Sequence, residues 1–144
     1  MSLLDNANQD LINIKLYYMI KPTKSGKKVM VIEDDKAEIM LKDPEKAKLV
    51  EVLDTYWKSL TWGEQRDLEG IATETGSDGE RNFNAIKFRD AAIKRCLKKW
   101  NMTVSDKPVE VASNYIDQRP AEIVFALYMK FNTAISYTDT EMGN

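Results

Sequence analysis

The chain has 144 residues, of which 43% are hydrophobic and 31% charged, and its formal net charge is −2. This composition is typical of a globular domain and excludes both a disordered chain and a general affinity for nucleic acid or anionic membranes. The sequence contains no histidine, which removes the commonest general base and metal ligand. A single cysteine cannot form the disulfide framework of a small secreted fold, so we expect a reducing compartment. The length predicts one domain over residues 1–144.

Residues 1–10 are polar and predict a flexible arm. They lack the basic region and the apolar run of a signal peptide. No segment approaches the roughly 18 consecutive apolar residues that span a bilayer, so we expect no membrane contact.

Residues 11–33 predict a β-hairpin. Alternate residues from Ile12 to Ile20 are apolar and fall on one face, and the other face carries Asn13, Lys15, Tyr17, Met19 and Lys21. A turn segment, residues 22–26, separates this strand from a second β-rich run at residues 29–32. Because two strands alone are marginally stable in water, we expect the hairpin to pack on helices or to pair with another chain.

Residues 43–60 favour a helix. Asp43-Pro44-Glu45 is a typical helix start, with an N-cap acceptor, a proline at the first position and an early acid. Apolar residues then recur at helical spacing: Val50, Leu53, Trp57 and Leu60. The β-branched residues in this segment leave a strand open as the alternative.

Residues 43–135 together are predicted to form the helical part of the domain. Thr61-Trp62-Gly63-Glu64 fits a capping box that opens a short helix, and residues 75–79 form a loop. A long helix is predicted from Phe83 to Trp100, with one apolar side formed by Phe83, Ile86, Ile93, Leu97 and Trp100. A connector, a short extended piece near Val109 and a helical turn at 114–117 follow. A final helix starts at Pro120 and ends near Ile135, before a fraying tail at 136–144. The predicted fold class is α+β, predominantly α-helical, with an N-terminal β-hairpin followed by about four helices.

No group of residues predicts catalysis or metal binding. The acidic run Glu33-Asp34-Asp35 and the acids around Gly79 lack the spacing of a Ca²⁺ loop. The glycines form neither a dinucleotide fingerprint nor a P-loop. Cys96 lies near an apolar face with no histidine to activate it. We therefore expect no enzymatic activity, no metal and no cofactor.

Basic residues gather at the hairpin turn and along the long helix, where Asp90 and Lys94 have the i,i+4 spacing of an ion pair. A solvated surface explains these charges better than nucleic-acid binding, since the chain as a whole is acidic.

The final helix is apolar most of the way round, which predicts either deep burial or a surface shared with a partner. One apolar side, Val124, Leu127, Phe131 and Ile135, is expected to face the core. A second apolar group, Phe125, Tyr128 and Met129, is expected to point outward or toward a groove and to bind a partner. On the hairpin, Tyr17 and Met19 offer a second contact surface. These five residues are the predicted site.

Three local features stand out: Leu60-Thr61-Trp62-Gly63-Glu64-Gln65 opening a helix, Trp100-Asn101 ending a long helix, and a polar turn with Pro108 before the last helix. Together they resemble the small tail morphogenesis proteins of tailed bacteriophages, of the tail assembly chaperone type. The resemblance spans about residues 56 to 135 in short motifs and leaves out the hairpin. It departs from the pattern at Asp106-Lys107-Pro108, which lacks a glycine before the proline, and at Arg119, where an apolar residue is usual.

The resemblance implies a non-enzymatic protein that assists phage tail assembly by contacting other tail proteins or its own copies. It would act in the host cytoplasm, or be retained in the virion. A structural subunit of the neck or baseplate is the first alternative. A small nucleic-acid-binding regulator is the second.

Overall fold

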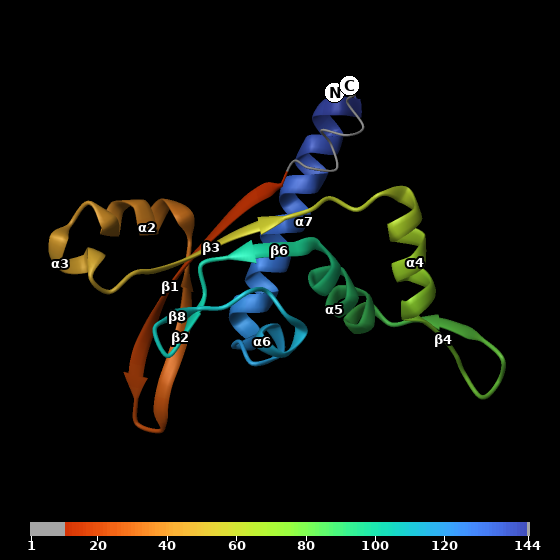
Figure 1. The fold of residues 1–144 in the computed structure, drawn as a ribbon, viewed down its shortest axis with the longest axis horizontal. Coiled ribbons are helices and arrows are strands. Elements are labelled where there is room, and N and C mark those ends of the chain that lie inside the picture. Colours follow the sequence, from red (N-terminus) through yellow and green to blue (C-terminus); the bar gives the residue numbers. More distant parts are fainter. Residues whose placement is uncertain (1–10, 144) are drawn as a thin grey trace.

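The computed structural model describes residues 11–143, and it places side chains for residues 11–135. Of residues 11–135, 44% are helical and 32% lie in strands, so the prediction of a predominantly α-helical fold is wrong. A four-stranded antiparallel sheet in the order β2-β1-β3-β6 forms its centre (Figure 1). The described elements are β1 (Ile12–Thr23), β2 (Gly26–Ile32), α2 (Asp34–Leu41), α3 (Pro44–Ala47), β3 (Glu51–Trp57), α4 (Trp62–Ala72), β4 (Thr73–Thr75), β5 (Arg81–Phe83), α5 (Ala85–Cys96), β6 (Leu97–Trp100), β7 (Thr103–Val104), β8 (Lys107–Pro108), α6 (Ser113–Asp117) and α7 (Ala121–Gly143).

The predicted hairpin is present. β1 and β2 pair antiparallel from Tyr17 opposite Ile32 to Thr23 opposite Gly26. Gly26 closes the turn with φ +140°, a backbone conformation that residues with a Cβ rarely adopt. The first half of β1 continues past the hairpin and pairs with β3, so the hairpin is built into a larger sheet.

The helix predicted after residue 43 is a single turn, α3, and the segment from Glu51 to Trp57 is strand β3. Leu53, Thr55 and Trp57 alternate toward the core, which is the period of a strand and not of a helix. The polar Thr55 hides this alternation in the sequence. It is fully buried because its hydroxyl donates to the Ile14 carbonyl at 2.6 Å and accepts from the Trp57 indole at 2.7 Å.

The long helix predicted from Phe83 to Trp100 is shorter than expected. Helix α5 begins after an Asn84 cap and ends at Cys96, and Leu97 to Trp100 form strand β6, paired with β3. Asn101 continues that edge, since its side chain accepts from the Asp54 N–H at 2.9 Å and donates to the Val52 carbonyl at 3.1 Å. The apolar residues of β6 therefore belong to a strand that pairs with β3, and they do not extend the apolar side of α5.

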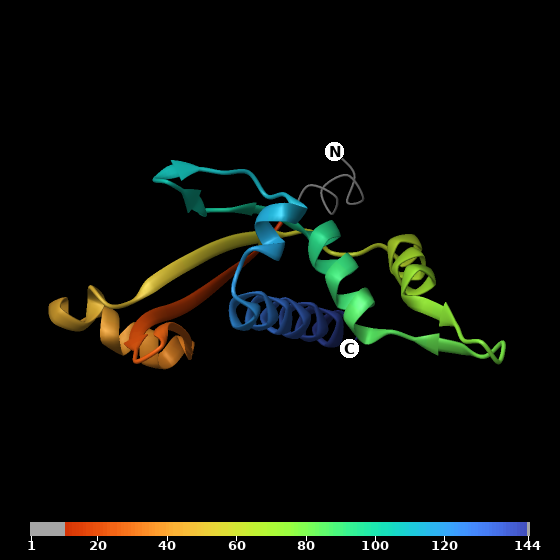
Figure 2. The same ribbon diagram turned by 90° about the horizontal axis from the view of Figure 1, so that it is seen from below.

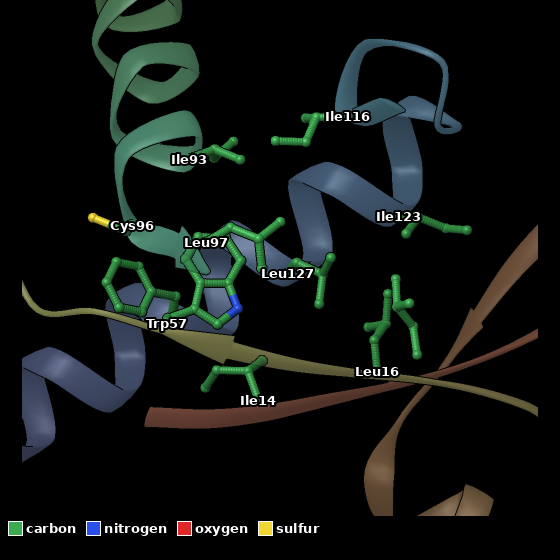
Figure 3. Close-up of a cluster of buried hydrophobic side chains, with 11 residues drawn as sticks. Ile14, Leu16, Trp57, Ile93, Cys96, Leu97, Ile116, Ile123 and Leu127 are labelled. Atoms are coloured by element: carbon green, nitrogen blue, oxygen red, sulfur yellow. The ribbon is translucent and has the colours of Figure 1, made fainter. Parts of the chain in front are cut away.

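Helix α7 lies across one face of the sheet (Figure 2). The main core forms between α7, the sheet, α5 and α6 (Figure 3). Its buried residues are Ile14, Leu16, Leu53, Trp57, Ile93, Cys96, Leu97, Ile116, Ile123, Leu127 and Phe131. This core fixes which side of α7 is buried and which is left outside.

A second, smaller core lies where α2 contacts the opposite side of the hairpin. It contains Ile32, Ala37 and Val50, with Tyr17 and Met19 packed against it. The acidic run Glu33-Asp34-Asp35 opens α2, where Asp34 and Asp35 occupy the first turn and interact favourably with the positive end of the helix. In Figure 1, α2 and α3 lie at one end of the molecule and α4 and β4 at the other, which makes the described chain elongated.

The final helix begins as predicted, because the N–H groups of Ile123 and Val124 both donate to the Pro120 carbonyl. Its backbone continues to Gly143, beyond the end expected near Ile135. The predicted capping box is also present, since Thr61 accepts from the Glu64 N–H at 3.2 Å and Glu64 accepts from the Thr61 N–H at 3.1 Å. The predicted arm at residues 1–10 lies outside the described residues.

Candidate partner-binding surfaces

Helix α7 is apolar on two sides. Leu127 and Phe131 are buried against the sheet, with 3% and 1% of their surfaces exposed. Phe125 and Met129, one turn apart on another side of the helix, are 47% and 48% exposed. Large apolar side chains that stay outside a finished core are candidates for contact with another molecule.

The predicted inward side of α7 is largely as expected. Val124 and Ile135 are partly buried and pack against the same core as Leu127 and Phe131. Ile123, which the sequence analysis left out, is 4% exposed and belongs to this core. Its position at i−4 from Leu127 is the signal that would have identified it.

Phe125 lies on the wall of a groove of about 490 Å³ between α5 and α7, which we call the α5–α7 groove. The guanidinium carbon of Arg89 lies 4.8 Å from the centre of its ring, a cation–π contact that holds one face of the ring. Ile86 forms the opposite wall and is 73% exposed. Ile86 was predicted on the apolar side of the long helix, and the structure places it at this surface.

Tyr128 is partly buried and lines a different hollow, of about 440 Å³, where α4, α5 and α7 meet. Phe88 and Trp62 line the same hollow, and Arg89 lies 5.9 Å from the Tyr128 ring centre. Trp62 is 74% exposed at the first position of α4. The sequence placed Trp62 in the capping box and in the resemblance but not in the predicted site, although an exposed indole can itself contact a partner.

Met129 and Tyr17 are brought together by the fold. Both line a hollow of about 670 Å³ between β1, α2 and α7, which we call the β1–α7 hollow. Lys130 crosses this hollow, because its ammonium group donates to the Lys15 carbonyl at 2.8 Å and forms an ion pair with Asp34. The hollow therefore combines an adaptable thioether, a tyrosine and a fixed cation.

Met19 does not join these residues. It packs against the small core under α2 and lines a separate hollow of about 520 Å³ with Met30 and Met40. Tyr17 also contacts that small core, so part of the predicted hairpin surface is covered by α2. The five predicted residues are thus spread over four hollows, with Tyr17 and Met129 sharing one.

The ionisable groups form ion pairs of structural character. Glu64 has a pKa lowered to about 2, first because Lys58 hydrogen-bonds to its carboxylate. Asp90 and Lys94 form the predicted ion pair at 3.2 Å, and Asp117 joins them at 3.0 Å.

Burial raises the pKa of the Cys96 thiol to about 11, which disfavours the nucleophilic thiolate.

Among the described residues, no three or more Cys, Asp or Glu side chains are grouped so that they could hold a metal ion. Within the same residues, no helix has the length and apolar character needed to cross a membrane. Comparison of the chain with known protein families, with curated proteins and with solved structures gives no match.

Proposed function

We propose that this chain is a non-enzymatic protein that binds another protein through the exposed side of α7, and that it acts in bacteriophage tail assembly. The observation that carries the binding role is the exposure of Phe125 and Met129 on a helix whose other side is already buried. Retaining two large apolar residues outside the core favours aggregation unless a partner covers them.

The β1–α7 hollow supports the same role, because Met129 continues from the exposed side of α7 into it. A partner segment with apolar side chains would find an adaptable methionine there, beside the Tyr17 ring. The Lys130 ammonium has one N–H left beside its bonds to the Lys15 carbonyl and Asp34, and that N–H would donate to an oxygen of the segment. The chemistry of this surface is that of recognition, with an apolar centre and a polar rim.

The assignment to tail assembly rests on the sequence resemblance. The capped start of α4 at Thr61 and the proline before α7 are present in the fold. Trp100-Asn101, in contrast, ends strand β6 instead of a long helix. The sequence motifs therefore support a tail protein as the partner, and the geometry of the fold supports the position of the binding surface.

Two measurements test this proposal. Co-purification with each tail protein encoded beside this chain should recover a defined complex with one of them. Protein analysis of purified phage particles should then lack the chain, as expected for an assembly chaperone. Its presence in particles would instead favour a structural subunit of the neck or baseplate. Failure to bind any tail protein would contradict the assembly role.

A nucleic-acid-binding role stays as a second candidate because of one observation. Lys21 lies opposite Lys28 across the hairpin, and Lys24 and Lys27 are beside them, all exposed and without an ion pair to any described residue. Like charges directly opposite each other are destabilising in a sheet. Binding to nucleic acid that weakens steeply with salt would support this candidate.

A further inference from the structure

Helix α4 and the β4–β5 pair extend from α5 away from the central sheet (Figure 2). Large apolar side chains on these elements are exposed: Trp62, Phe83 and Ile86.

We propose that a second copy of this chain covers the face formed by α4, α5 and α7, so that the protein is a homodimer. This inference goes beyond the proposed function, since it concerns a different partner and a surface that shares only Phe125 with the surface proposed for the tail protein. We call this surface the arm face and define it by the exposed residues Trp62, Phe83, Ile86 and Phe125.

The arm face is continuous. Ile86 and Phe125 form the two walls of the α5–α7 groove. Arg89 connects this groove to the neighbouring hollow, since its guanidinium contacts the rings of both Phe125 and Tyr128. Tyr128 shares that hollow with Trp62 and Phe88. The Phe88 ring in turn lies 5.6 Å from the Phe83 ring, so that the four exposed residues belong to one surface.

The area of the arm face matches what a dimer needs. Its four side chains are 74%, 58%, 73% and 47% exposed in the order Trp62, Phe83, Ile86, Phe125. Side chains of this size have about 150–250 Å² each, so together they expose on the order of 500 Å² of apolar surface. Because about 60% of an interface is apolar, this apolar area corresponds to about 800 Å² per partner, which is the standard size of a stable interface.

The charges around the groove favour a second copy over a partner of one charge sign. The lining residues carry both signs, with Arg89 on one side and Asp90 and Glu122 beside it. In a two-fold arrangement each copy presents the same surface to the other, so cations and carboxylates can face each other across the axis.

Sedimentation of the purified protein alone tests the proposal. The wild type should sediment at twice 16.5 kDa at micromolar concentrations. Trp62→Glu combined with Ile86→Glu should raise the dimer dissociation constant by about tenfold or more, because two exposed anchors become charged. The matched control is Ile39→Glu on α2, an equally exposed apolar residue at 68%, which should leave the dimer unchanged.

Folding is checked by thermal melting of each variant. If the glutamate pair lowers the melting temperature, the milder pair Trp62→Ala and Ile86→Ala replaces it, and loss of dimer with an unchanged melt supports the proposal. A wild type that is monomeric up to about 100 µM, or a dimer that both pairs leave intact, overturns it. Because no tail protein is present, this outcome is independent of co-purification with a tail partner.

Discussion

The indole of Trp57 stacks on the ring of Phe131, with ring centroids 4.6 Å apart and an interplanar angle of 22°. This contact joins strand β3 to helix α7, and both side chains are fully buried in the main core. It therefore fixes the rotation of α7 about its axis, which decides that Phe125 and Met129 lie outside.

Phe131→Ala should lower the free energy of unfolding by about 3–5 kcal/mol, since it opens a cavity beneath the Trp57 ring. The matched control is Phe125→Ala, the same substitution on the same helix at a residue that is 47% exposed. That control should cost no more than about 1 kcal/mol. Chemical denaturation measures both, and equal losses would contradict the position of α7.

Thr61→Ala should destabilise the fold by about 1 kcal/mol, because the Glu64 N–H loses the side chain that caps it. An unchanged denaturation midpoint would mean that helix α4 does not start at this residue. Thr133→Ala is the control, since that exposed hydroxyl only donates to a carbonyl of its own helix.

Acid should weaken the protein partly through Glu64. Its folded pKa of about 2 lies below the 4.5 of an unperturbed glutamate, chiefly because of the hydrogen bond from Lys58. The carboxylate therefore contributes stability that is fully present above about pH 4.5 and is lost as the pH falls toward 2. Glu64→Gln should reduce the slope of stability against pH in that window. Glu69→Gln on the same helix, where no described cation pairs with the acid, should reduce it less. An identical slope in wild type and Glu64→Gln would contradict this ion pair.

Cys96 should resist thiol reagents in the native protein. The side chain is completely buried, and its thiol pKa is raised to about 11, so almost no thiolate exists near neutral pH. We expect a chromogenic disulfide reagent to label it only after denaturation. Rapid stoichiometric labelling of the folded protein would show that the core around α5 opens readily.

Local signals in the sequence predicted the parts of the fold that depend on neighbouring residues. The alternation in β1, the turn at Gly26, the Thr61 cap and the start of α7 at Pro120 all have their cause within a few positions of the chain. Each of these features was predicted at or near its position in the structure.

Strands β3 and β6 could not be predicted in the same way, because their causes are distant in sequence. Burial of the Thr55 hydroxyl depends on Ile14, on another strand, which accepts its hydrogen bond. Leu97 leaves the helical pattern to pair with Trp57, forty residues earlier. Short apolar segments of this kind fit either period until a partner strand decides between them.

The candidate site could be predicted only in part, for a similar reason. The two-sided apolar pattern of α7 was sufficient to place Phe125 and Met129 outside. It gave no information on Ile86 or Trp62, because their exposure depends on how α4 and α5 extend from the sheet. Tyr17 and Met129 line the same hollow only because α7 packs on β1.

Binding by the double variant Phe125→Ala, Met129→Ala tests the central claim most directly. These side chains are about half exposed, so the account predicts a small shift in the thermal melt and a loss of co-purification with the tail partner of about tenfold or more. Ile39→Ala combined with Leu49→Ala removes two exposed apolar residues from elsewhere and should leave binding intact. A melt that collapses in the Phe125 and Met129 variant while partner binding by the remaining folded protein is unchanged would contradict the account, because those residues would then belong to the core.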